Sequence, residues 1–358
     1  MEIKEDIYNI LDEVIQPVGE FNQYDGIHKI ITGMIEGDEK CTDYEIGLRG
    51  VTWVEYKDIN EVMAGACEGG YLKFVLELID LGANNWRHGF ISACKGGHID
   101  IVKLMLSHDD SSSRDGLSVA CSKRHINLID MFLERKNTNV DSGLAGACEG
   151  GHMDIIERMI ALGAHNWNNG LEEACEGGHI NCVKLMLEKG ATDYNTGLQS
   201  ACKGGHIDIV KLMISLGAII CRTAFGNACR YGHIDVVKLL LEKETRYIED
   251  GLSEACFNKH IDVVELLTTE PYNYIPSLFE ASATGEIKFI ELAINSGDDN
   301  FDEGLKCAAE YGNINVIELM IDKGADNFAE ALAEAVKCEE KEAFEFLVSF
   351  IRKRYEWE

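Results

Sequence analysis

Apolar residues in this chain recur at helical spacing in two short blocks that alternate with glycine and polar residues. In the segment from Gly197 to Ala218, the first block has Leu198, Ala201 and Cys202 at positions i, i+3 and i+4, on one face of a short helix. The second block predicts a longer helix with apolar positions at Ile207, Val210, Met213 and Ile214.

Polar residues and glycines mark the ends of these helices. Gly204 and Gly205 break the first helix, and Asp208 falls in the first turn of the second, where it complements the helix dipole. Gly217 stands just past the second helix, where a left-handed cap favours a residue without Cβ. Each unit is therefore predicted as helix, tight turn, longer helix and a short loop.

This unit is one copy of an internal repeat. The pair Ala-Cys recurs every 27 residues from Ala66-Cys67 to Ala255-Cys256. The frame continues, one residue early, at Ala281-Ser282 and then at Ala308-Ala309 and Ala335-Val336. One unit is too small to bury its own apolar face, whereas stacked units bury it continuously. The sequence predicts an all-α solenoid of about eleven helix-turn-helix repeats.

The ends of the chain depart from the repeat. Residues 1–56 lack it, contain predicted helices at Ile3–Val18 and Ile27–Ile35, and are interpreted as an N-terminal helical capping segment. A small motif that recruits a second protein is the alternative for this segment. Residues 57–338 form the predicted repeat array, and residues 339–358 are interpreted as a C-terminal capping helix, because terminal units of a solenoid need a polar outer face.

The repeated string Leu-x-x-Ala-Cys-x-Gly-Gly-His-Ile-Asp-Ile-Val-Lys-Leu-Met-Leu-x-x-Gly-Ala resembles the second half of the ankyrin repeat. The period is 27 residues instead of about 33, and Gly-Leu replaces the usual Thr-Pro-Leu-His opening. The resemblance implies truncated hairpin fingers, with partner contacts moved toward the helices. This abbreviated form is similar to ankyrin proteins of large DNA viruses of protists.

Charge narrows the range of partners. Asp and Glu number 62 against 33 Lys and Arg, which gives a formal net charge of −29. Such a field repels phosphate backbones and anionic lipids, so nucleic acid and membrane are not expected as partners. A protein partner with a basic surface is expected instead.

The same sequence predicts an intracellular protein. No apolar run approaches the about 18 residues of a membrane span. The acidic start of the chain does not have the form of a secretory signal. We therefore expect a cytoplasmic location, in the host cell if the protein is viral.

Pairs of Cys and His at i, i+4, such as Cys94 and His98, have a spacing that zinc sites use. The pairs recur in seven units, and units about 10 Å apart cannot pool four ligands. Each Cys is therefore expected to face the core, and the ankyrin resemblance implies that each His bonds loop backbone. The Gly-Gly pair lacks the remaining residues of a phosphate-binding loop. We expect no catalytic residues, no metal, no cofactor and no small-molecule substrate.

Binding residues are sought where the units differ, because core positions must be alike for stacking. In ankyrin proteins the two residues before Gly-His lie on the concave face and commonly touch partners. From residue 230 onward these positions gain arginine and aromatic residues, which dominate binding hot spots. The predicted partner-binding residues are Arg230, Tyr231, Phe257, Asn258, Tyr311 and, as a neighbour, Phe279. The alternative is a decaying repeat whose larger side chains only fill gaps.

The array is also irregular near Pro271 and Pro276, where the one short interval of 26 residues falls. We expect a kink or an altered stacking angle between the units at 255 and 281.

The expected function is that of a protein–protein interaction scaffold or adaptor, and not an enzyme. Two alternatives remain open. One is a subunit that recruits substrates to a modifying enzyme such as a ubiquitin ligase. The other is a structural component that self-assembles, for instance in a virus particle.

Overall fold

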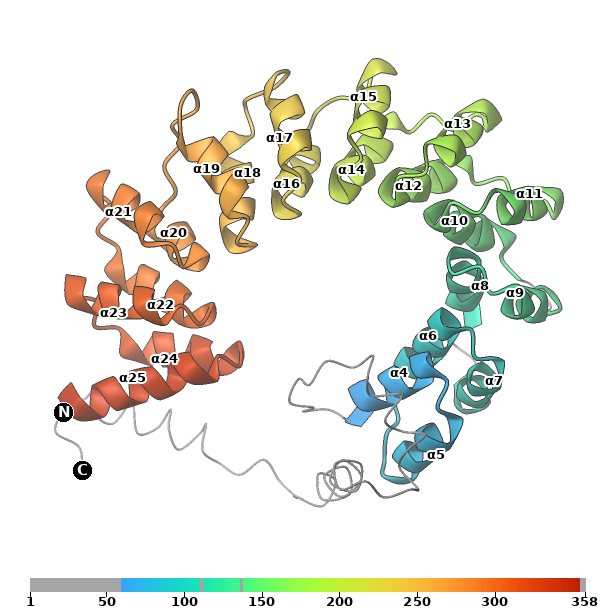
Figure 1. The fold of residues 1–358 in the computed structure, drawn as a ribbon, viewed down its shortest axis with the longest axis horizontal. Helices are drawn as coiled ribbons and strands as arrows, with labels where there is room; N and C mark the ends of the chain where they lie inside the picture. Colours follow the sequence, from blue (N-terminus) through green and yellow to red (C-terminus); the bar gives the residue numbers. More distant parts are fainter. Residues whose placement is uncertain (1–58, 110–112, 136–137, 355–358) are drawn as a thin grey trace. The chain divides into compact units, whose positions relative to one another are not determined.

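A computed structural model describes residues 59–109, 113–135 and 138–354 of the chain. In these residues all regular secondary structure is helical, with 22 helices in eleven consecutive pairs and no strand (Figure 1). This confirms the predicted all-α, ankyrin-like solenoid of short repeats. The predicted capping segment 1–56 lies outside the described residues. The predicted domain boundaries therefore stay predictions.

The helices fall into two compact units, which divide between Asp193 and Tyr194. The N-terminal unit contains α4 (Ile59–Gly69), α5 (Leu72–Asp80), α6 (Trp86–Gly96), α7 (Ile99–His108), α8 (Ser113–Ser122), α9 (Ile126–Leu133), α10 (Val140–Gly150), α11 (Met153–Ala161), α12 (Trp167–Gly177) and α13 (Ile180–Lys189).

The C-terminal unit continues the same alternation. It contains α14 (Tyr194–Gly204), α15 (Ile207–Ser215), α16 (Arg222–Arg230), α17 (Ile234–Leu241), α18 (Ile248–Phe257), α19 (Ile261–Thr268), α20 (Leu278–Thr284), α21 (Ile287–Asn295), α22 (Phe301–Glu310), α23 (Ile314–Lys323), α24 (Phe328–Lys337) and α25 (Lys341–Arg354). Within each unit the first helices of the pairs form one layer and the second helices form another (Figure 1).

The prediction of a short first helix and a longer second helix is wrong. α14 has 11 residues and α15 has 9, and the first helix begins earlier than the apolar spacing indicated. The additional turn starts at an aromatic or aliphatic residue, such as Trp86, Trp167 or Phe301. The loop before each first helix is short because the helix begins at this residue. Too few residues remain in that loop to form a hairpin finger.

The core is a row of small residues on the first helices facing branched and Met side chains on the second. Ala201 and Cys202 are fully buried in α14, as are Val210 and Met213 in α15. The glycine of each Gly-Leu opening makes room for the second helix. A Cβ at Gly170 would lie 2.6 Å from Sδ of Met186, so a larger residue would force the buried Met186 side chain to shift.

The Gly-Gly-His string joins each helix pair to the preceding helix pair. The ring of His98 packs on Gly70, whose φ of +82° is in the left-handed region, and its Nε2 lies 2.9 Å from the carbonyl oxygen of Glu68. A carbonyl only accepts, so Nε2 carries the hydrogen. A Cβ at Gly96 would collide with the same Glu68 oxygen. The prediction that these histidines bond backbone is confirmed for five of them.

We name these five bonds the histidine ladder. The bonds run from His98 to Glu68, from His125 to Lys95, from His152 to Ser122, from His233 to Lys203 and from His260 to Arg230, at 2.7–2.9 Å. Each bond spans 30 residues, and a neutral hydrogen bond of this kind contributes about 0.5–1.5 kcal/mol.

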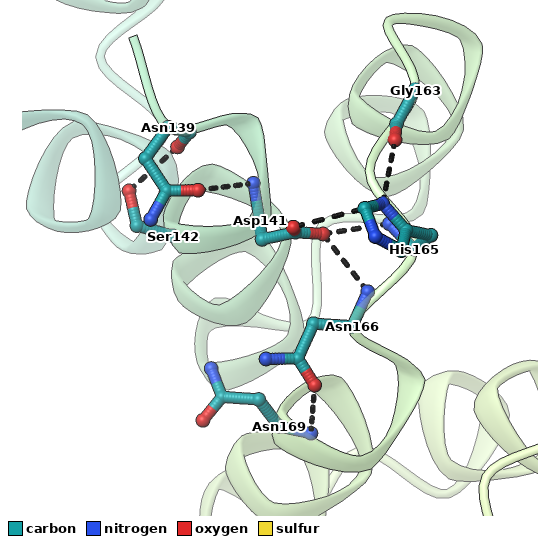
Figure 2. Close-up of polar contacts among 7 residues, drawn as sticks. All are labelled: Asn139, Asp141, Ser142, Gly163, His165, Asn166 and Asn169. Atoms are coloured by element: carbon teal, nitrogen blue, oxygen red, sulfur yellow. Dashed lines mark hydrogen bonds and ion pairs between the residues drawn. The ribbon is translucent and has the colours of Figure 1, made fainter.

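A second set of side chains ties each loop to the preceding unit. Asp141, the second residue of α10, accepts the backbone N–H groups of His165 at 2.6 Å and Asn166 at 2.9 Å (Figure 2). Asn166 in turn caps α12 by accepting the N–H of Asn169 at 3.3 Å. The loop N–H groups before the helix are thus satisfied without a β-hairpin partner.

The same register position performs this role in other units. Asn60, Asn168 and Asp302 each accept two loop N–H groups, and Asn195 accepts that of Ile219. We name these residues the loop acceptors. The sequence analysis did not identify them, although an Asn or Asp at this position in the 27-residue register was a visible signal.

Helix packing predicts the effect of adding one methyl group at Gly146 in α10. Its Cβ would collide with the backbone oxygen of Ser118 in α8 and lie 2.8 Å from Ser118 Cα, and backbone cannot rotate away. Gly146→Ala is expected to lower the free energy of unfolding by about 1–3 kcal/mol, measured by urea denaturation. The matched control is Gly226→Ala, because the nearest atom to its Cβ is Glu254 Cγ at 3.8 Å. Equal effects of the two substitutions would contradict this packing.

The loop acceptors give a second prediction. Asp141→Ala removes the acceptor of two N–H groups and is expected to cost about 1 kcal/mol in the free energy of unfolding. Asp141→Asn is expected to keep most of that stability, because Asn168 makes the same two bonds one unit later. Thermal and urea unfolding of both variants would test this, and the interpretation fails if the two substitutions are equally costly.

Candidate functional site

Five of the six predicted partner-binding residues lie where first helices of the C-terminal unit end, and the sixth, Phe279, is the second residue of α20. Arg230 and Phe257 are the last residues of α16 and α18. Tyr231, Asn258 and Tyr311 are the C-caps of α16, α18 and α22. The regular repeat thus brings residues of successive units to the same end of one layer.

The Phe257 side chain contacts aromatic rings from each of the next two helix pairs. The ring of Phe257 lies edge-on to Phe279, with 5.6 Å between centroids, and nearly parallel to Tyr311, with 6.3 Å between centroids. Such pairs add about 0.5–1.5 kcal/mol beyond the area they bury. We name Phe257, Phe279 and Tyr311 the aromatic cluster.

The contact between Phe257 and Tyr311 passes over an intervening helix pair. In α20 the positions that correspond to Phe257 and Asn258 hold Ala283 and Thr284, which are both buried. Small side chains at these two positions leave room for rings from either side. The three aromatic side chains themselves stay partly exposed to solvent.

A lysine that the sequence analysis did not identify completes this arrangement. Lys259 Nζ lies 5.5 Å from the Tyr311 ring centroid and donates to the Tyr311 carbonyl at 3.2 Å and to Asn313 Oδ1 at 3.3 Å. Lys259 occupies the position of the second glycine in other units, with φ of 58°. A lysine at a glycine position was the signal that could have identified it.

Arg230 and Tyr231 make separate contacts. Arg230 donates to both carboxylate oxygens of Glu254, at 2.8 and 2.7 Å, and so joins α16 to α18. Tyr231 stacks on His233, with 6.4 Å between ring centroids, and is 44% exposed. Asn258 donates to the Glu254 carbonyl at 2.8 Å, within its own helix end.

Exposure separates the two interpretations of this region. Arg230, Tyr231 and Asn258 are exposed, and the aromatic cluster is partly exposed. Burial of Arg230, Tyr231 and Phe257 between units would have excluded a binding role, and they are not buried. Their role in binding therefore stays a prediction.

The titration of Tyr311 reflects its surroundings. Burial, together with the negative charge of Glu310, raises the pKa of Tyr311 to about 12. The phenol is therefore neutral at physiological pH, and its hydroxyl remains a hydrogen-bond donor.

The repeated cysteines face the core. Cys94 and Cys202 are fully buried, and burial raises the pKa of each thiol to about 12. Within the part of the chain that the structure describes, no three His, Cys, Asp or Glu side chains are grouped to hold a metal ion. The histidine of the Cys94–His98 pair is engaged with the Glu68 carbonyl. Likewise, no helix in residues 59–109, 113–135 and 138–354 combines the length and apolar character needed to cross a membrane.

Comparisons with known proteins agree with the repeat. A family model described as "Ankyrin repeats (3 copies)" matches residues 144–223 and 198–277. Among solved structures, the human ASB11 ankyrin repeat domain is 24% identical and has a TM-score of 0.32. That match covers 57% of this chain and 96% of the ASB11 chain. No curated protein matches the chain.

Residues 144–277 therefore match ankyrin repeats, as predicted from the sequence. Ankyrin repeats generally bind protein partners and are typically non-enzymatic interaction modules. The comparisons support an interaction role in this general sense, and the partner and its binding residues have to be argued from the chain itself.

Cysteine burial predicts an order of chemical reactivity. Thiolates and not thiols are alkylated, so buried thiols whose pKa is raised to about 12 react slowly at pH 8. Cys221 and Cys338 are partly exposed. We expect iodoacetamide to modify them at least about tenfold faster than Cys94 and Cys202, as measured by peptide mass spectrometry. Unfolded protein is the control, and equal rates in the folded protein would contradict the packing.

Proposed function

We propose that this chain is a protein-interaction module that binds its partner through the aromatic cluster and the neighbouring Arg230 and Tyr231. The observation that carries the proposal is the contact of Phe257 with Phe279 and Tyr311 across three helix pairs while all three rings remain partly exposed. Arginine and aromatic residues are the side chains that contribute most at protein interfaces.

The helix ends fix these side chains before a partner arrives. Arg230 is held by two hydrogen bonds to Glu254, and the Tyr311 ring contacts both the Phe257 ring and the Lys259 ammonium. Side chains that are already ordered lose little conformational entropy on binding. A preorganised surface of this kind suits a scaffold or adaptor.

Charge argues for a partner with a basic surface. The chain carries a formal net charge of −29. Arg230 is paired with the Glu254 carboxylate, which offsets its charge, whereas Lys259 bonds only the neutral Tyr311 carbonyl and Asn313 amide and keeps its charge. The acidic excess of the chain as a whole therefore favours a basic partner, which gains from steering at low salt. Nucleic acid and membrane remain unexpected on the same grounds, and no small-molecule substrate is expected either.

The narrower alternatives are kept as proposals. A subunit that recruits substrates to a modifying enzyme such as a ubiquitin ligase would use residues 1–56 to hold a second partner. A self-assembling component of a virus particle would form oligomers in a concentration-dependent way. A non-enzymatic role, a cytoplasmic location, and a relation to ankyrin proteins of large DNA viruses of protists are likewise proposals.

The test of the proposed function compares two matched double variants in cross-linking affinity capture from intact cells. Tyr231→Ala/Phe257→Ala removes two side chains of the candidate surface. Ile219→Ala/Ile275→Ala removes two exposed apolar side chains elsewhere in the C-terminal unit, which are 68% and 49% exposed. We expect the first pair to reduce capture of the partner about tenfold or more and the second pair to leave it unchanged.

Further measurements keep the outcome interpretable. Circular dichroism and urea unfolding establish that both variants fold, and Tyr231→Ala alone serves as a variant whose side chain supports little packing. Binding of the purified partner should weaken as salt is raised, because steering of opposite charges is screened. If both double variants capture the same proteins as the unmodified chain, the proposal is wrong. If the chain captures only itself, self-assembly replaces it.

A further inference from the structure

A ladder donor is missing at two interfaces of the described C-terminal unit: between the pairs α18–α19 and α20–α21, and between α22–α23 and the last pair, α24–α25. We name the first of these two interfaces the seam. Glu286 stands where other units have the ladder histidine, and it is exposed. An ionised carboxylate accepts hydrogen bonds and donates none, so it cannot bond the Phe257 carbonyl.

Interfaces on both sides of the seam keep the bond. His260 bonds the Arg230 carbonyl at 2.7 Å across the preceding interface. Asn313 donates to the carbonyls of Ser282 at 2.8 Å and Ala283 at 3.1 Å across the following one. Glu340 also replaces the histidine, but at the last pair of the array.

The N-terminus of α20 is capped by residues of its own repeat and not by residues of the preceding one. Ser277 and Glu280 form a capping box, and the N–H of Leu278 bonds Asp298 at 2.7 Å. In the loops before α6, α12, α14, α16 and α24, a loop acceptor of the preceding helix pair makes bonds of this kind to loop N–H groups. The loop that enters α20 is also long, from Thr269 to Ser277, and α20 itself has only seven residues (Figure 1).

The ion pair that crosses the seam is exposed to solvent. Lys288 pairs with Glu265, and the two side chains are 48% and 54% exposed, which makes a weak ion pair. Phe257 packs against the partly exposed Phe279. Lys259 reaches past α20 to Tyr311 and Asn313 and so clamps the seam from the outside.

We propose that the seam is an opening point built into the C-terminal unit, at which α18–α19 separates locally from α20–α21 far more often than neighbouring pairs separate. The aromatic cluster and Lys259 form the clamp that closes it. An interface that lacks the side-chain-to-backbone bond of its neighbours opens at a lower free energy than those neighbours.

The opening would regulate the candidate surface. Phe257 lies on one side of the seam, and Phe279 and Tyr311 lie on the other. Opening therefore splits the aromatic cluster, and a partner that contacts all three rings would favour the closed form. This consequence rests on the proposed function, whereas opening itself is measured on the chain alone, so the two ideas can fail separately.

Hydrogen exchange of the full chain followed by mass spectrometry tests the opening. We expect protection factors in residues 278–285 about tenfold lower than in residues 222–230, whose interface keeps His260. Equal protection of the two segments would overturn the proposal.

A gain-of-function substitution makes the test sharper. Glu286→His supplies the missing donor, and the structure already contains a precedent. His152 bonds the Ser122 carbonyl although the preceding unit has Arg124, with φ of 59°, at the position that Lys259 occupies here. We expect Glu286→His to raise protection in residues 278–285 about two- to tenfold. Glu286→Ala, which removes the carboxylate without adding a donor, should not.

The clamp has its own variant. Lys259→Met keeps most of the side-chain length but removes the ammonium, and we expect it to lower protection in residues 278–285 and 301–312 together. Equal gains from Glu286→His and Glu286→Ala would mean that charge and not the missing bond sets the opening. No change with Lys259→Met would show that the Lys259 ammonium does not help to close the seam. Either of these two results would overturn the corresponding part of the proposal.

Discussion

The carbonyl at the end of each first helix is the group on which the stacking of this protein depends. A pair of helices about ten residues long cannot bury its apolar face alone, so each pair must be fixed against its neighbour. The ring of His98 does this by packing on Gly70 while its Nε2–H bonds the Glu68 carbonyl. One imidazole thereby satisfies a backbone acceptor, fills the space above a glycine and sets the register of two units.

This constraint explains which parts of the structure could be predicted from the sequence. Because every helix pair has to be packed in the same way, the repeated sequence indicated the helix pairs, the buried cysteines and the left-handed glycine after the second helix, as at Gly217. The length of the first helix was underestimated, since apolar spacing does not report the polar first turn that follows Tyr194. Loop acceptors such as Asp141 were also missed, because their bonds to the next loop are visible only in three dimensions.

The positions of the candidate binding residues could be predicted from the sequence, but the contacts between their side chains could not. Differences between units indicated Phe257 and Tyr311, yet residues 54 apart touch only because α20 carries Ala283 and Thr284 between them. The kink expected near Pro271 stays a prediction. Near this proline the structure shows two residue replacements. Glu286 stands where other repeats have the ladder histidine, and Lys259 stands where other repeats have a glycine.

The constant sequence offsets of the bonds between units also determine how such a chain can change in length during evolution. Histidine bonds span 30 residues, and loop acceptors reach 24 and 25 residues ahead. Duplication or loss of a complete 27-residue copy conserves every one of these offsets, so a recombination event can lengthen or shorten the array without designing a new interface. Loss of a single residue conserves none of them across the altered junction. The one 26-residue interval is found where the histidine has been replaced.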